Sequence, residues 1–125
     1  MGAARAPDRV PLAMDDPLQP QHCAEMLSAL AAPERLQIIR LLCDGPRSVG
    51  EIAAELKAPL VNVSHHLGVL RQARLVCNRK QGRHVIYSLS PDLLQAEGDG
   101  GPDRLNLGCC RLELPGPESP STDER

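Results

Sequence analysis

Length, composition and the distribution of charge set the first limits on this chain. Its 125 residues suffice for one compact domain. The composition is 42% apolar but only 1% aromatic, with Tyr87 as the sole aromatic residue, which favours a helical core built from aliphatic side chains. No apolar run approaches the roughly 18 residues of a membrane span, and no secretory signal is present, so we expect a cytoplasmic protein without a membrane partner.

The net charge of −2 is distributed very unevenly along the chain. Residues 1–32 carry a net charge of −2, residues 33–91 of +5, and residues 92–125 of −5. Between residues 57 and 91 there are six Lys and Arg side chains and no carboxylate. Such a stretch is typical of a surface that contacts phosphates, although a basic face exposed only to solvent would look the same. The composition therefore allows nucleic-acid binding despite the acidic total.

The first part of the chain predicts an arm followed by two helices. Residues 1–19 lack apolar periodicity and are expected to form a flexible arm. An apolar repeat with the spacing i, i+3, i+4, i+7 begins at Cys23 and predicts an amphipathic helix that ends near Ala32. Pro33 suits the first turn of a second helix, which Gly45 ends.

The next segment predicts a helix-turn-helix and a β-hairpin. Ser48 and Glu51 have the spacing of a capping box and open a third helix. A fourth helix begins at Pro59 after a short turn. Two β-rich runs follow, residues 75–80 and 83–89, with a Gly-containing turn between them. The expected inner stripe of the fourth helix is Leu60, Val63, Leu67 and Leu70.

This element order predicts a winged helix-turn-helix, a mainly α fold with a small β-hairpin (α+β), with four to five helices and a two-stranded wing over residues 20–96. After it we expect at most a short helix through Leu93 and Leu94. Residues 97–114 form a cysteine-containing segment, whose apolar part we expect to be held against the domain. Residues 115–125 are rich in Pro, Ser and acidic residues and are expected to be a disordered tail.

The fourth helix is the element expected to read DNA. A helix in the major groove needs one apolar face for its own domain and one face that reaches base edges. At 100° per residue, Val61, Asn62, His65 and Gly68 point away from the inner stripe. His66 lies at the edge of the packed face, so it fits a structural role as well as a DNA contact. The candidate DNA-binding residues are Asn62, Ser64, His65, His66, Arg71, Arg79, Lys80, Arg83 and His84.

Three blocks of sequence, in order, resemble the ArsR/SmtB family of bacterial transcriptional regulators. They are LAAPERLQIIRLL at residues 30–42, VSHHLGVLR at 63–71 and GRHVIYSL at 82–89. The resemblance implies a homodimeric winged helix-turn-helix repressor. It also implies release from double-stranded operator DNA when a metal, metalloid or oxidant reacts with the protein.

The chain also departs from this family at three places. The arsenic-type Cys-x-Cys motif is absent, because residues 47–52 read RSVGEI. The zinc-type site on a long final helix is absent, because no His follows His84 and Gly98 interrupts that region. The fourth helix opens with Pro59, Leu60 and Val61 where relatives have small polar residues, which leaves fewer groups for reading bases.

The cysteines Cys109 and Cys110 remain as candidates for metal or redox sensing. Adjacent thiolates can share a soft ion but cannot complete its site, so a further sulfur must join from Cys23, Cys43, Cys77 or a partner subunit. The resemblance implies two arrangements: three-coordinate binding of arsenite, or redox or sulfide sensing in which Cys43 pairs with Cys109 or Cys110. Cys23, Cys43 and Cys77 also fit as small buried hydrophobes.

Arsenite or another thiophilic metal ion is therefore the expected ligand, with no other cofactor. We do not expect an enzyme, because no base such as His lies near Cys109 or Cys110 in the sequence. A winged-helix module that binds another protein is the alternative outside gene regulation.

Overall fold

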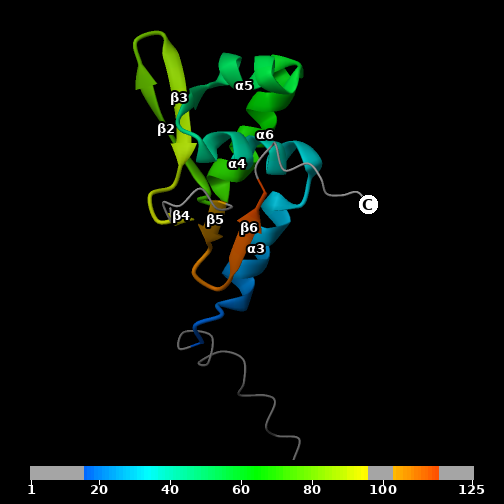
Figure 1. Ribbon diagram of the computed structural model, residues 1–125, viewed down its shortest axis with the longest axis vertical. Coiled ribbons are helices and arrows are strands. Elements are labelled where there is room, and N and C mark those ends of the chain that lie inside the picture. The colour runs from blue at the N-terminus through cyan, green and yellow to red at the C-terminus, as the bar shows by residue number, and fades with distance from the viewer. Residues whose placement is uncertain (1–15, 96–102, 116–125) are drawn as a thin grey trace, which may run out of the picture.

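The computed structural model describes residues 16–95 and 103–115, which form helices packed against a β-hairpin at one end and a smaller sheet at the other (Figure 1). The helices in this part of the chain are α3 (Pro20–Leu30), α4 (Pro33–Cys43), α5 (Val49–Leu56) and α6 (Leu60–Gln72). The strands are β1 (Arg47–Ser48), β2 (Val76–Gln81), β3 (His84–Leu89), β4 (Leu94–Gln95), β5 (Asp103–Asn106) and β6 (Arg111–Leu114). The predicted winged helix-turn-helix is thus confirmed.

The start of α5 is fixed by the predicted capping box. The Glu51 backbone N–H donates to Ser48 Oγ over 3.2 Å, and the Ser48 N–H donates to Glu51 Oε1 over 2.8 Å. Both bonds satisfy amides that have no partner inside the helix. The Ser48 backbone therefore ends β1 and opens α5 at one defined position, which sets the start of the helix-turn-helix.

The wing consists of β2 and β3 paired antiparallel, from Val76 opposite Leu89 to Gln81 opposite His84. The turn is Gly82–Arg83, one residue later than the sequence suggested. Gly82 has a φ of +64°, which glycine adopts without strain, and a positive φ at the first turn position suits the twist of a tight hairpin. The wing also gains a third strand, β1, which pairs with β3.

The core lies where the helices meet the base of the wing. Its fully enclosed aliphatic side chains include Ile38, Ile39, Ile52, Leu67, Leu70 and Leu75. The expected inner stripe of α6 holds except at Leu60, which is 55% exposed. Leu60 is the first residue of α6, so its side chain lies beyond the edge of the core.

The C-terminal part forms a second antiparallel sheet in the order β4-β5-β6. The expected short helix through Leu93 and Leu94 is wrong, because Leu94 begins β4 and pairs with Leu105. The Asn106 N–H donates to the Leu93 carbonyl over 2.6 Å, and Leu105 and Leu107 are buried in the core. The expectation that this apolar segment packs against the domain is confirmed.

The expected arm (1–19) and tail (115–125) fall mostly on residues 1–15 and 116–125, outside the described part. Within that part, no helix has the length and apolar character needed to cross a membrane.

Candidate nucleic-acid interface and cysteine cluster

The exposed face of α6 carries polar side chains in the positions expected for reading DNA. Val63, Leu67 and Leu70 turn into the core, which leaves the opposite side of the helix exposed. Asn62, Ser64, His65 and Arg71 are exposed. The buried stripe thus orients α6 so that its polar residues lie together at the surface.

His66 differs from the other candidate residues on α6, because it is half-buried and bonded. Its Nδ1 lies 3.2 Å from Arg35 Nη1, and Arg35 Nε donates to the Ala29 carbonyl over 2.6 Å. The guanidinium therefore joins the end of α3 to α6 from its position on α4. This geometry favours the structural role for His66.

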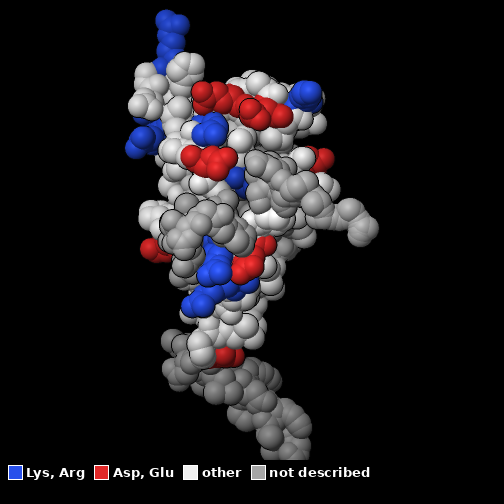
Figure 2. All heavy atoms as spheres, viewed as in Figure 1, with Lys and Arg blue, Asp and Glu red and all other residues white. Residues whose placement is uncertain are grey.

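The wing carries the remaining basic candidates. Arg79, Lys80, Arg83 and His84 are exposed on β2, the turn and β3. Figure 2 shows Lys and Arg side chains at the far end of the hairpin, whereas carboxylates lie over the region of α5. The hairpin thus carries basic side chains and no carboxylate, although the chain is acidic in total.

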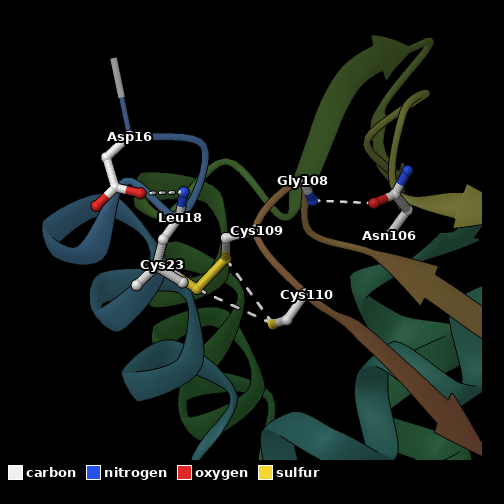
Figure 3. The surroundings of a disulfide bond; sticks show 7 residues. All are labelled: Asp16, Leu18, Cys23, Asn106, Gly108, Cys109 and Cys110. Carbon is white, nitrogen blue, oxygen red and sulfur yellow. Dashed lines mark hydrogen bonds between the residues drawn. A yellow bond between two sulfur atoms is a disulfide. The ribbon is translucent and has the colours of Figure 1, made fainter. Parts of the chain in front are cut away.

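A second candidate site lies at the opposite end of the molecule from the wing turn, where the β5–β6 connection lies beside α3 (Figure 1). Cys23 on α3 and Cys109 form a disulfide bond. Cys110 Sγ lies 3.9 Å from Cys23 Sγ and 3.8 Å from Cys109 Sγ (Figure 3). The three sulfurs lie within 4.8 Å of one another. We call these three residues the cysteine cluster.

The tight connection between β5 and β6 brings the adjacent cysteines to α3. The Gly108 N–H donates to Asn106 Oδ1 over 3.0 Å, and the Leu107 N–H donates to the Cys110 carbonyl over 2.9 Å. Gly108 has a φ of +89°, which strains residues with a side chain. These bonds hold the turn so that both Cys109 and Cys110 face Cys23 (Figure 3).

Of the sulfurs that the sequence left open, Cys23 is the one that joins the adjacent pair. Cys43 is half-buried at the end of α4, outside the cluster, and Cys109 is paired with Cys23 rather than with Cys43. Cys77 is exposed on β2, with its Sγ 3.6 Å from Ser88 Oγ. The apolar spacing at Cys23 marked it as a core residue, and it is indeed buried.

Together, α5, α6 and the three-stranded wing define a winged helix-turn-helix domain. Residues 32–77 match a family model described as the arsR family of bacterial regulatory proteins. The transcriptional repressor SdpR of Bacillus subtilis is 33% identical over 70 residues, which cover 56% of this chain and 78% of that protein. The chain belongs to the ArsR family.

Other relatives have higher identity over a smaller share of their length. The HTH-type transcriptional regulator Rv2034 of Mycobacterium tuberculosis is 46% identical over 54% of this chain and 64% of that protein. A transcriptional repressor SmtB homolog of Synechocystis is 44% identical over 58% of this chain and 54% of that protein. The chain thus spans between about half and two thirds of these two relatives. All three relatives are named as regulators or repressors, in line with a protein that is not an enzyme.

Solved structures agree with the fold. A homodimeric winged helix-turn-helix DNA-binding domain from Mycobacterium bovis has a TM-score of 0.55 and 34% identity, over 56% of this chain and 65% of that one. A possible transcriptional regulator for arsenical resistance has a TM-score of 0.52 and 39% identity, over 54% of this chain and 70% of that one.

Proposed function

We propose that this chain is a sequence-specific DNA-binding transcriptional repressor that binds an inverted-repeat operator as a homodimer. The observation that carries the proposal is a helix-turn-helix whose second helix, α6, leaves a polar face exposed next to a basic wing. Residues 57 to 91 contain no carboxylate that would repel a phosphate backbone. The two relatives named as repressors support the direction of regulation, and the homodimeric domain from Mycobacterium bovis supports the assembly.

The candidate residues divide into three roles. Asn62, Ser64 and His65 can hydrogen-bond base edges from the exposed face of α6. His66, bonded to Arg35, supports the orientation of α6. The basic side chains contact phosphates or enter the minor groove, which sets the register of the protein on the duplex. These side chains are Arg71, Arg79, Lys80, Arg83 and His84.

The test is fluorescence anisotropy with the DNA upstream of the protein's own gene and with random duplex of equal length. We expect preference for the upstream DNA, half-sites about one helical turn apart, and affinity that falls steeply with salt. Replacing Arg79, Lys80 and Arg83 together with Ala should lower the salt slope by about 3 if each contacts one phosphate.

Equal affinity of the wild type for both duplexes would contradict the proposal. If the triple variant keeps full DNA affinity but loses a protein partner, the domain is a protein-interaction module instead. The Cys77→Ser variant, which changes an exposed residue on the same hairpin without changing charge, is the matched control.

For the signal, we propose that arsenite binds the cysteine cluster and releases the repressor. The three sulfurs lie within 4.8 Å of one another, so they can surround one soft ion. Only small movements of the sulfurs would bring each of them to a metal–sulfur distance of about 2.3 Å. The Cys23–Cys109 disulfide must first be reduced to two thiols by a thiol reductant. One arsenous acid then reacts with three thiols and releases three waters.

The disulfide itself favours a second candidate signal, an oxidant. Two thiols of Cys23 and Cys109 would exchange with an oxidised low-molecular-weight disulfide, which leaves as two thiols while the protein disulfide forms. This route needs only two of the three sulfurs. The third, Cys110, therefore distinguishes the two signals.

A polar connection offers a route from the cluster to the DNA-reading helix. Helix α3 carries both Cys23 and Ala29. The Ala29 carbonyl accepts a hydrogen bond from Arg35 Nε, and Arg35 Nη1 is within hydrogen-bond distance of His66 Nδ1 on α6. A shift of α3 that accompanies chemistry at the cluster would thus act on a bond to α6. The cluster and the wing turn lie at opposite ends of the molecule (Figure 1), so a signal from the cluster must pass through the helices, and this connection is one route.

The deciding experiment titrates the reduced protein–operator complex with arsenite, zinc, copper(I), a persulfide and oxidised glutathione. In the wild type we expect release by arsenite. Cys110→Ser should abolish the arsenite response if three sulfurs are needed, but it should keep the response to oxidised glutathione if Cys23 and Cys109 act as a redox pair. Cys77→Ser is the control. Arsenite release that persists unchanged in a Cys109→Ser/Cys110→Ser double variant would overturn the role of the cluster.

A further inference from the structure

Two large apolar side chains lie exposed at the start of α6. Leu60 is 55% exposed and Val61 is 72% exposed. Of the exposed large hydrophobic residues in the described part of the chain, these two have the highest exposure, above Leu18 at 49% and Leu36 at 39%. These two exposed apolar side chains lie beside the exposed polar residues of α6, so they are candidates for contact with the partner that this face binds.

The position of Val61 indicates what that partner is. Residues in the first turns of a recognition helix reach base edges. Val61 and His65 are four residues apart on α6, and Gly68 follows three residues later, so the three lie along one side of the helix. A Cβ atom built at Gly68 would meet nothing within 4 Å, so this side is open to a close approach. Val61 therefore belongs to the same exposed face as the candidate base-reading residues.

The chemistry of the major groove indicates which group on the DNA an exposed valine would contact. Base edges there present hydrogen-bond donors and acceptors, and the only apolar group among them is the 5-methyl group of thymine. A valine against a donor or acceptor would leave that polar group unsatisfied, whereas a valine against a methyl group removes apolar surface of both from water.

We propose that Val61 is a specificity-determining residue that contacts a thymine 5-methyl group in each half-site. The inference rests on the proposed DNA binding. Recognition of thymine is thus assigned to the first turn of α6, where the side chains are apolar. Asn62 and His65 then contact the neighbouring base edges.

The test uses the full chain and the duplex that it selects most strongly from a random library. This duplex is synthesised with thymine and, separately, with uracil, which lacks only the 5-methyl group. We expect the wild type to bind the thymine duplex more tightly, by about fourfold for each contacted methyl group. Single uracil substitutions should map the effect to symmetric positions in the two half-sites.

The Val61→Ala variant should lose most of the discrimination at those positions, because its side chain is shorter, while its affinity for the uracil duplex stays near that of the wild type. Leu36→Ala, which truncates an exposed leucine on α4, should keep the full discrimination. Thermal unfolding followed by circular dichroism checks that both variants fold.

The outcomes separate this inference from the function on which it rests. If the library yields no preferred sequence, the proposed sequence-specific binding fails. If a sequence is selected but the wild type binds the thymine and uracil forms equally, the inference is overturned and the DNA binding stands. Discrimination that persists undiminished in Val61→Ala would also overturn it, because the removed valine methyl groups would then not contact the thymine.

Discussion

At the scale of single residues, the Ser48 cap contributes a measurable part of the stability. Replacing Ser48 with Ala removes the acceptor for the Glu51 N–H while leaving the helix sequence otherwise intact. We expect the free energy of unfolding to fall by about 1 kcal/mol, measured by urea denaturation. Ser64→Ala, which removes an exposed hydroxyl from the helix α6, is the matched control and should change stability little. Equal losses in the two variants would contradict a specific capping effect.

Residues whose role is local could be predicted from the sequence, and residues whose role depends on distant segments could not. The Ser48–Glu51 box was predicted because both partners lie within one turn. The selection of Cys23 for the cluster could not be predicted, because its partner Cys109 lies 86 residues away and is brought there by the C-terminal sheet. The exposure of Leu60 was also missed, since periodicity does not show where a core ends.

At the scale of elements, Arg35 connects three helices and is expected to couple the two ends of the molecule. Arg35→Met keeps much of the aliphatic stem but removes the bonds to the Ala29 carbonyl and to His66. We expect the ratio of operator affinities without and with arsenite to shrink about fivefold or more, because allosteric couplings are commonly 1–3 kcal/mol. The measurement is anisotropy on the reduced protein. A ratio equal to that of the wild type would exclude this route.

The element order was predictable as far as Leu89 because apolar periodicity and turn residues agree there. Helices α3 to α6 and the hairpin were all expected; the hairpin turn lies one residue later, and the two-residue strand β1, which pairs with β3, was missed. The C-terminal sheet was missed. Its strands are two to four residues long, too short for an alternating pattern to emerge, and each pairs with a neighbour inside this sheet.

At the scale of the whole molecule, the Cys23–Cys109 disulfide closes most of the chain into a loop and should stabilise the fold. In the chain-entropy description, a cross-link between residues 86 positions apart restricts the unfolded state strongly. We expect Cys23→Ser to lower the free energy of unfolding by about 2 to 4 kcal/mol under oxidising conditions. Urea denaturation with and without reductant measures it, and the loss should shrink when the wild type is also reduced, leaving only the cost of a buried hydroxyl at residue 23. A loss of the same size in Cys77→Ser would contradict the assignment.

The same bond has a topological consequence. Every residue of the helix-turn-helix and the wing lies between Cys23 and Cys109, so the oxidised chain contains a covalent macrocycle. A protease that cuts one peptide bond inside this ring opens it without releasing a fragment, and the two pieces separate only when the sulfurs are reduced. The unfolded macrocycle is also more compact than the linear chain, so its faster migration on a non-reducing denaturing gel would report the oxidation state of the cluster directly from cell extracts.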